Sequence, residues 1–306
     1  MLMIALMPTY EAIGIAAPII IVAARLLQGF ATGGEYSSAT SFLLEVAPAN
    51  RRGLYTSWQM FGQGIALLCG ASVGTLITHA LPPDAVDSWG WRIPFLLGLL
   101  IGPVGLWIRR HLDETNAFLE ARAAPPEKRS LTWLLRNHWR ELAIVTGLTT
   151  LGTVSFYVLI IYMPIFAHTT LKLALSEIFL AQVIAIALMT VLIPLFGRLS
   201  DSIGRKPILV VAALVVMIAV YPLATWLAAA PSFANLLIMQ LILCSSIGAY
   251  FGPFSAALAE QFPAVLRSTG LAIGYNAAVV VFGGFAPFTV TWLSSATGEP
   301  GAPFLY

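Results

Sequence analysis

Residues 197–207 read GRLSDSIGRKP, and four of these eleven side chains carry a full charge, namely Arg198, Asp201, Arg205 and Lys206. The segment lies between AQVIAIALMTVLIPLF (181–196) and ILVVAALVVMIAV (208–220), and neither of these runs contains a charged residue. A charged link between two such runs is typical of a turn between two membrane-spanning helices. Gly197 and Gly204 indicate a tight turn with closely approaching helices.

The composition of the whole chain gives the same indication. Of its 306 residues, 58% are hydrophobic and only 10% are charged, and the mean hydropathy is +0.86. A soluble domain is usually about a quarter charged, so this chain is expected to be an all-α protein of the membrane. A span requires about 20 apolar residues. That rule predicts complete helices over 17–47, 54–79, 92–109, 141–166, 176–196, 207–229, 234–260 and 268–293.

The positions of the basic residues predict how these helices are oriented. Most Lys and Arg residues fall in alternate links, which contain Arg51 and Arg52, the segment 198–206, and Arg267. The long connection near the middle of the chain holds most of the others. Because an excess of Lys and Arg marks the cytoplasmic side, these links are expected in the cytoplasm and the helices in the cell inner membrane. The start of the chain has no basic region typical of a cleavable signal peptide.

The chain divides into two helical groups with a repeated feature. We expect a first bundle over 1–110, a cytoplasmic linker with short surface helices over 111–138, and a second bundle over 139–306. EVAPANRRGLYTSWQMFGQGIALLCG begins at Glu45, and EQFPAVLRSTGLAIGYNAAVVVFGG begins at Glu260. Each has Pro three residues after the Glu, then Arg, then a glycine-containing helix. Repeated halves of this kind favour a carrier that works by alternating access.

Several motifs resemble one transporter family. GRLSDSIGRKP matches the G-x-x-x-D-x-x-G-R-K/R loop motif of the major facilitator superfamily, and RLLQGFATGGE (25–35) is similar to its fourth-helix motif. RLLQGFATGGEYSSA, SWGWRIPFLLG, YFGPFSAALAEQFP and STGLAIGYNAAVVVFGG resemble its metabolite:proton symporter branch. The resemblance implies carriage of citrate, α-ketoglutarate, shikimate, proline or betaine. It also implies that the first complete helix here is the family's fourth and the last its eleventh, so both ends look truncated.

The charged link suggests a gate on the cytoplasmic side. We expect Asp201 beside the positive N-terminal end of the helix that begins near Arg267, and ion pairs from Arg205 and Lys206 to Glu260. Asp201 is also within expected reach of Arg267. The simpler alternative, a plain topology signal, explains the basic residues but neither Asp201 nor the glycines. The predicted gate comprises Glu45, Arg51, Gly197, Asp201, Gly204, Arg205, Lys206, Glu260 and Arg267.

Polar residues inside the spans are candidates for binding substrate and proton, because such residues are costly in a bilayer. Arg25, Gln28 and Glu35 share one face of the first span. Glu35 is the candidate proton carrier, and Arg25 either binds a substrate carboxylate or pairs with Glu35; a structural ion pair is the alternative. The other candidates for a cavity lining are Gln59, Gln63, Tyr157, Gln182, Tyr250, Tyr275 and Asn276. Any one of these, taken singly, is more often a hydrogen bond between helices than a ligand contact, but as a set they are expected to line a cavity.

Other classes of function find little support in the sequence. The four histidines have no metal-ligand spacing, and neither a GxSxG motif nor a Walker loop occurs, so we expect no enzyme, metal or cofactor. Nucleic acid is not an expected partner. The sequence favours a monomeric, proton-coupled symporter of a small organic acid of the citrate or dicarboxylate type. The alternatives are a symporter of zwitterions such as proline or betaine, a substrate sensor with a carrier fold, and a non-transporting fragment.

Overall fold

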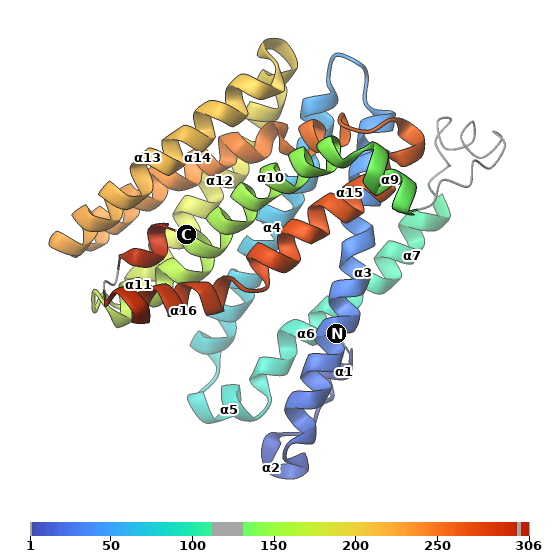
Figure 1. The fold of residues 1–306 in the computed structure, drawn as a ribbon. Helices are drawn as coiled ribbons and strands as arrows, with labels where there is room; N and C mark the ends of the chain where they lie inside the picture. The colour runs from blue at the N-terminus through green and yellow to red at the C-terminus, as the bar shows by residue number, and fades with distance from the viewer. Residues whose placement is uncertain (1, 112–130, 299–300, 306) are drawn as a thin grey trace.

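The computed structural model describes residues 2–111, 131–298 and 301–305, and this part of the chain contains helices and no strand (Figure 1). The α-helices are α1 Leu2–Ala5, α2 Tyr10–Ile13, α3 Ala16–Val46, α4 Arg52–Ala80, α5 Pro83–Ser88, α6 Ile93–Leu97, α7 Ile101–His111, α9 Leu131–Asn137, α10 Trp139–Phe156, α11 Met163–Thr169, α12 Leu175–Ile203, α13 Arg205–Ala229, α14 Phe233–Ala259, α15 Ala264–Ala278 and α16 Ala286–Thr297. Short 3-10 turns cover Gly90–Arg92, Gly98–Leu100 and Ala302–Leu305, and π-turns cover Tyr157–Tyr162 and Val279–Gly283.

The predicted spans correspond to helices long and apolar enough to cross a membrane, of which the described residues contain eight. Trp139–Thr169 and Ala264–Thr297 are longer than predicted, because each continues through a π-turn, and Leu175–Ile203 is longer because it continues through the charged segment. The span expected at 92–109 is instead Gly90–Trp107, which 3-10 turns interrupt. In the linker expected at 111–138, α9 covers its last part, and residues 112–130 lie outside the described residues.

The π-turn between α10 and α11 has a local cause. Pro164 has no backbone N–H, so the carbonyl of Ile160, four residues earlier, lacks its helical donor. The side-chain amide of Gln182 on α12 donates to that carbonyl instead. Gln182 was expected to line a substrate cavity, but the structure uses it to satisfy a backbone group left free by proline.

The charged segment 197–207 is helical along almost its whole length. Helix α12 continues to Ile203 and α13 begins at Arg205, so the link between them is Gly204 alone. The φ angle of Gly204 is +92°, in the region that residues with a side chain rarely adopt. The predicted tight turn is therefore present, but the charged side chains project from helix ends rather than from a loop.

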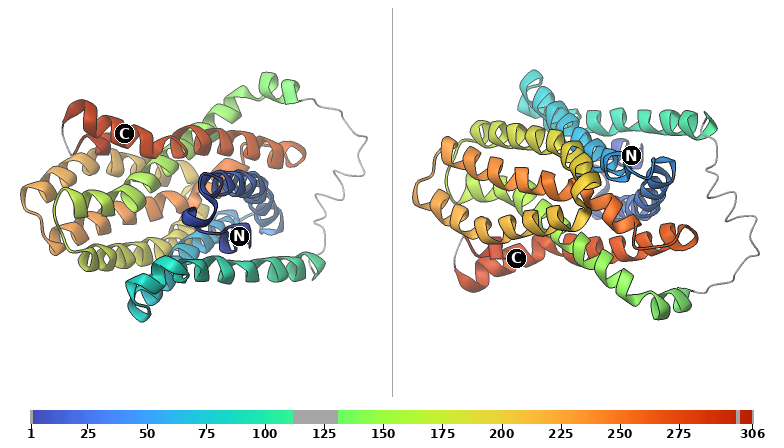
Figure 2. Two further views of the ribbon diagram at one scale, coloured as in Figure 1. Left: turned by 90° about the horizontal axis from the view of Figure 1, so that it is seen from below. Right: turned by 90° about the horizontal axis from the view of Figure 1, so that it is seen from above.

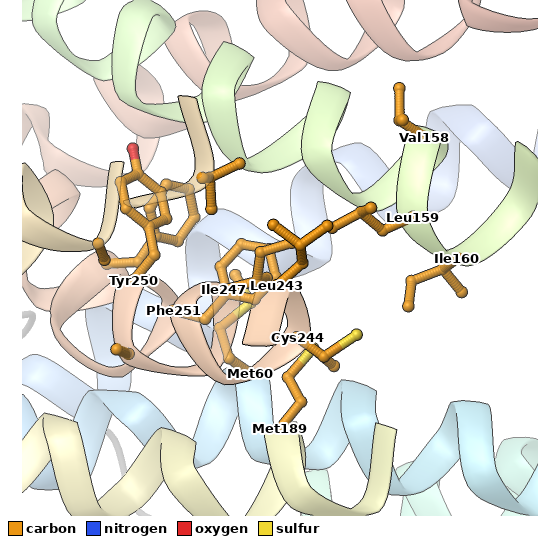
Figure 3. Close-up of a cluster of buried hydrophobic side chains, with 14 of the residues drawn as sticks. Met60, Val158, Leu159, Ile160, Met189, Leu243, Cys244, Ile247, Tyr250 and Phe251 are labelled. Atoms are coloured by element: carbon orange, nitrogen blue, oxygen red, sulfur yellow. The ribbon is translucent and has the colours of Figure 1, made fainter. Parts of the chain in front are cut away.

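The core lies where α14 packs against α12, α13 and α4, and Figure 3 shows part of it. Met60 on α4, Met189 on α12 and Leu243 on α14 meet there, and all three are buried. Small residues permit this close packing. A Cβ atom added to Gly197 would lie 2.6 Å from Ser57 Cβ and 2.9 Å from the carbonyl of Gly53. Helix α4 of the first half thus contacts α12 of the second almost backbone to backbone.

The outer surface is apolar, as a bilayer requires. Leu26, Met217 and Phe288 are 66–70% exposed, and many other large apolar side chains are exposed as well. Figures 1 and 2 show α3 running in a different direction from α13 and α14. We call the end of the molecule at which the helix ends carrying Arg51, Arg205 and Arg267 lie the basic end.

Candidate functional site

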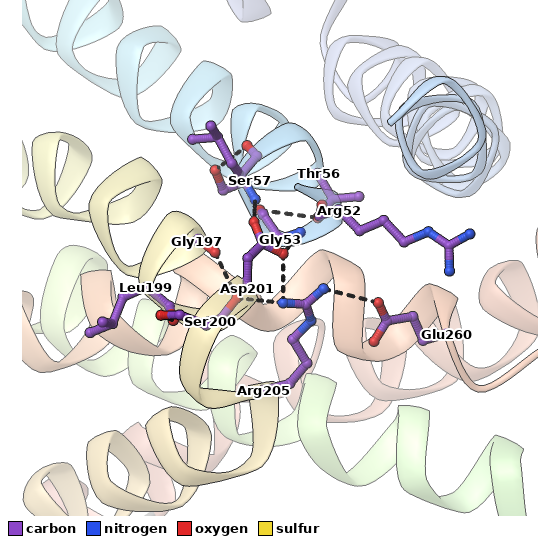
Figure 4. Close-up of polar contacts among 12 residues, drawn as sticks. Arg52, Gly53, Thr56, Ser57, Gly197, Leu199, Ser200, Asp201, Arg205 and Glu260 are labelled. Carbon is purple, nitrogen blue, oxygen red and sulfur yellow. Dashed lines mark hydrogen bonds and ion pairs between the residues drawn. The ribbon is translucent and has the colours of Figure 1, made fainter. Parts of the chain in front are cut away.

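At the basic end, the carboxylate of Asp201 caps a helix of the other half (Figure 4). The backbone N–H of Gly53 donates to Asp201 Oδ1 at 2.7 Å, and that of Leu54 donates to Oδ2 at 2.9 Å. These groups belong to the first turn of α4, where N–H groups have no partner within the helix. The residue before α4, Arg51, provides no side-chain cap. Asp201 therefore does for α4 what an N-cap side chain does, and its charge faces the positive end of the helix dipole.

Arg205 joins Asp201 to Glu260 within the second half of the chain. Its Nη1 lies 2.8 Å from Asp201 Oδ1 and 3.1 Å from Ser200 Oγ, and its Nη2 lies 3.1 Å from Glu260 Oε1. Side-chain exposure is 8% for Asp201 and 18% for Arg205, so solvent screens this arrangement only in part. Because α12, α13 and α14 all belong to the second half, these ion pairs hold Asp201 in position but do not themselves join the halves.

A second charged contact does join the two halves. Arg267 Nη1 on α15 lies 3.2 Å from Glu45 Oε1 on α3, and Arg267 Nε donates to the carbonyl of Ala259 at 3.1 Å. Ser41 and Ser268 on the same two helices approach to 3.5 Å between hydroxyl oxygens. We call this contact line between α3 and α15 the seam.

The gate expected from the sequence needs three corrections. Asp201 caps α4 rather than the helix containing Arg267, because the glycine contact at Gly197 places α12 against the start of α4. Arg267 pairs with Glu45 and not with Asp201. Lys206 and Arg51 are exposed, and neither is in an ion pair within the described residues. The partners of Asp201 are backbone N–H groups of α4, and no side-chain pattern in the sequence indicates such partners.

Deeper in the protein, aromatic and amide contacts extend the seam. The rings of Tyr36 on α3 and Tyr275 on α15 stack with centroids 3.9 Å apart and an angle of 15° between their planes. The Tyr36 hydroxyl hydrogen-bonds with Ser255 Oγ of α14 at 3.2 Å. Asn276 Nδ2 donates to the carbonyl of Gly33 at 3.1 Å, so this predicted cavity residue instead bridges α3 and α15.

A cavity of about 210 Å³ lies between α4 of the first half and α10, α12, α14 and α15 of the second. We call it the central cavity. Its apolar walls include Phe156, Phe251 and Phe254. Its polar lining consists of Gln63, Thr149, Thr153, Tyr157 and Tyr275, and none of the described lining residues carries a formal charge.

Thr149 gives the cavity a polar group without a partner. The residue is 1% exposed, and its hydroxyl has no hydrogen-bond partner among the described residues. A buried hydroxyl without a partner is costly, and a ligand in the cavity would satisfy it. Thr149 and Thr153 were not predicted from the sequence, although Thr149, Thr153 and Tyr157 recur at the four-residue spacing of one helix face.

The structure brings only some of the predicted binding residues to this cavity. Gln63, Tyr157 and Tyr275 line it, whereas Gln59, one turn from Gln63, does not. Tyr250 donates its hydroxyl to the carbonyl of Leu148 at 2.8 Å, which is a contact between helices.

The ionisable pair predicted on α3 is also placed elsewhere. Arg25 Nη1 donates to Gln28 Oε1 at 3.0 Å, and Arg25 is exposed. Glu35 is exposed as well, and no ion pair joins it to Arg25 in the described structure. Arg25, Gln28 and Glu35 do lie on one helix, α3, but this helix turns Tyr36 and not Glu35 toward the seam.

These features define a multi-pass membrane protein with a central cavity between α4 and helices α10, α12, α14 and α15. The chain matches the sequence model of the Major Facilitator Superfamily over residues 1–287, and it therefore belongs to that family. It is 35% identical to the "Citrate-proton symporter" of Salmonella typhi over 302 residues, covering 99% of this chain and 69% of the relative. It is 31% identical over 316 residues to a "Glycine betaine/proline/ectoine/pipecolic acid transporter" of Dickeya dadantii, covering 99% and 62%. These relatives match the metabolite:proton symporter branch, as the motifs predicted.

A solved structure shares the fold. The proton:xylose symporter XylE, bound to 6-bromo-6-deoxy-D-glucose, superposes with a TM-score of 0.71 at 20% identity. The match covers 87% of this chain and 63% of XylE. The chain thus spans between three fifths and seven tenths of the length of these proteins.

Proposed function

We propose that the chain forms the substrate-carrying core of a proton-coupled symporter for a small organic acid, in the cell inner membrane with the basic end in the cytoplasm. The central cavity carries this proposal, because it lies between the two halves and holds the unpartnered hydroxyl of Thr149. Alternating-access carriers bind substrate in that position. The similarity to the citrate-proton symporter of Salmonella typhi makes citrate and dicarboxylates the first candidates.

In the mechanism that this geometry supports, the structure is the state closed at the basic end. Residues 1–110 and 139–306 move as two bundles, and the linker 111–138 connects them. Opening the basic end requires Asp201 to leave the first turn of α4 and Arg267 to leave Glu45. The partly exposed ion pair between Arg267 and Glu45 contributes only about 0–1 kcal/mol, so it suits a gate that opens in every cycle.

The proton carrier in this proposal is Glu35. The described lining of the central cavity holds no carboxylate, so a proton cannot be carried there by an acidic side chain. Glu35 precedes Tyr36, which joins α3 to Tyr275, so its protonation state is positioned to influence the seam. Arg25 lies ten residues earlier on α3, about 15 Å along the helix, and is the proposed ligand of a substrate carboxylate.

A zwitterion is the second candidate substrate, and the chemistry of the cavity favours it. Three phenylalanines and two tyrosines line a space with no charged side chain among its described residues. A citrate-like trianion there would lack a cationic partner, and burying unpaired charge is costly. Aromatic faces, by contrast, attract a quaternary ammonium group. Transport of glycine betaine or proline would leave the remainder of the mechanism unchanged.

The test is uptake by liposomes that contain the purified chain. Labelled citrate and labelled glycine betaine are offered separately, with the lumen more alkaline than the medium. We expect one of them to accumulate, accumulation to stop when a protonophore dissipates the pH gradient, and Thr149→Val to weaken it. Liposomes without protein are the blank. Equal uptake with and without the gradient would rule out proton symport, and no uptake of either compound would rule out the proposed substrates.

A further inference from the structure

We propose that Tyr275 couples occupation of the central cavity to opening of the seam, an inference that rests on the proposed transport function. Tyr275 is the residue that belongs to both features. It lines the cavity, and its ring stacks on Tyr36 of α3 at 3.9 Å. Tyr36 does not line the cavity. A ligand that displaces the Tyr275 ring therefore acts on α3 through this stack.

The partner ring is firmly held, so displacement of Tyr275 has a defined consequence. Tyr36 is 5% exposed, and its hydroxyl hydrogen-bonds with Ser255 on α14. Because Tyr36 cannot follow a moving Tyr275 without losing that bond, a shift of Tyr275 weakens the stack rather than carrying both rings along. Stacked rings contribute enough beyond their buried area to change an equilibrium by about two- to tenfold.

The contacts around the stack transmit its loss along the seam. Asn276, the next residue, donates to the carbonyl of Gly33, and a Cβ atom at Gly33 would lie 3.0 Å from the Asn276 side chain. Helices α3 and α15 therefore touch at this level. Eight residues toward the basic end, about 12 Å along the helix, the same two helices are joined by Arg267 and Glu45. The stack is thus the inner end of a contact line whose outer end is the charged pair.

Disulfide trapping of the seam measures the coupling. Ser41 and Ser268 hydroxyl oxygens are 3.5 Å apart, so cysteines at both positions would cross-link when the seam is closed. The background carries Cys69→Ser to remove the exposed native thiol, while Cys244 is buried and stays. Cross-linking rates are measured with and without saturating citrate or glycine betaine, whichever is taken up. Binding of the same labelled compound is measured in parallel.

Four variants separate coupling from packing. Tyr275→Leu and Tyr36→Leu remove the stack, and we expect each to lower basal cross-linking by about two- to tenfold and to abolish its response to substrate. Tyr36→Phe keeps the stack but frees the ring from Ser255, so its basal cross-linking should stay near that of the parent while its response to substrate weakens. Tyr221→Leu, on α13 and outside the seam, is the matched control and should behave as the parent. Each variant is first shown to insert into the membrane and, once purified, to elute from a size-exclusion column as the parent protein does.

The outcomes distinguish this inference from the proposed function. If Tyr36→Leu and Tyr275→Leu bind substrate and their cross-linking still responds as in the parent, the coupling role is wrong while transport stands. A parent that responds and Leu variants that bind without responding would support it. If the parent neither binds nor accumulates either compound, the proposed function fails and the inference fails with it.

Discussion

Replacing Asp201 by Asn should favour the state open at the basic end. In the closed structure its two carboxylate oxygens accept N–H groups from Gly53 and Leu54 of the opposite half. Asn has one acceptor oxygen and no charge, so one of these bonds is lost and the other becomes a neutral bond. The pair with Arg205 lies within the second half and persists in both states, so it cancels from the comparison.

The magnitude follows from the burial of the carboxylate. The Asp201 side chain is 8% exposed, so its bonds are little screened by solvent. A hydrogen bond to a charged group contributes about 1.5–3 kcal/mol and a neutral one about 0.5–1.5 kcal/mol. Losing one charged bond and neutralising the other therefore costs the closed state about 2.5–4.5 kcal/mol. Since about 1.4 kcal/mol is a factor of ten, the open population should rise roughly 60- to 2,000-fold.

Alkylation of a cysteine at position 41 measures this shift. Ser41 is 7% exposed on the seam, so Ser41→Cys in a Cys69→Ser background should react slowly in the closed state. We expect Asp201→Asn to speed the reaction in proportion to the open population and to slow pH-driven uptake. Lys206→Gln is the matched control, because it removes a neighbouring charge that has no ion pair in the described structure. Alkylation of Asp201→Asn at the parent rate would refute the reasoning, and acceleration by Lys206→Gln would point to charge alone.

Three further substitutions test separate contacts. Gly197→Ala should lower the midpoint of thermal unfolding in detergent, because its Cβ would lie 2.6 Å from a side chain of α4 and overpacking costs about 1–3 kcal/mol. Gly62→Ala, whose Cβ would meet open space, should not; equal effects would contradict the close helix contact. Gln182→Leu should lower the free energy of unfolding by about 1–3 kcal/mol, because the carbonyl of Ile160 loses its donor. Adding Pro164→Ala restores a backbone N–H and should recover most of that loss. Absence of recovery would refute that assignment. Thr149→Val should leave the unfolding midpoint unchanged or higher yet weaken substrate binding several-fold; unchanged binding would place the substrate elsewhere.

The membrane spans were predictable because hydrophobicity is a property of each segment by itself. A bilayer requires a long apolar helix wherever the chain crosses it, whatever the neighbours are. The limits of the spans were less accurate, because apolar runs do not show where a helix continues into water. Helix α12 illustrates this, since it continues through charged residues to Ile203.

The candidate sites were only partly predictable. The predicted ion pair between Arg205 and Glu260 is present at the basic end, with Gly197 and Asp201 beside it. The partner of Asp201 was predicted wrongly, because backbone amides look alike in every sequence. Polar residues within the spans predicted the cavity lining only in part. Gln63 lines the cavity, but Gln182 donates to a backbone carbonyl that a proline on another helix leaves without its helical donor.

By itself, the sequence determined that this chain lies in a bilayer, where its helices are and to which family it belongs, because those properties follow from local composition and motifs. Only the tertiary structure decided which helices meet across the two halves. It made Asp201 the cap of α4, paired Arg267 with Glu45 and placed Tyr275 between the cavity and the seam. Such contacts depend on how helices cross, and helix crossing is set by side chains far apart in the chain that fit together only when both helices are present.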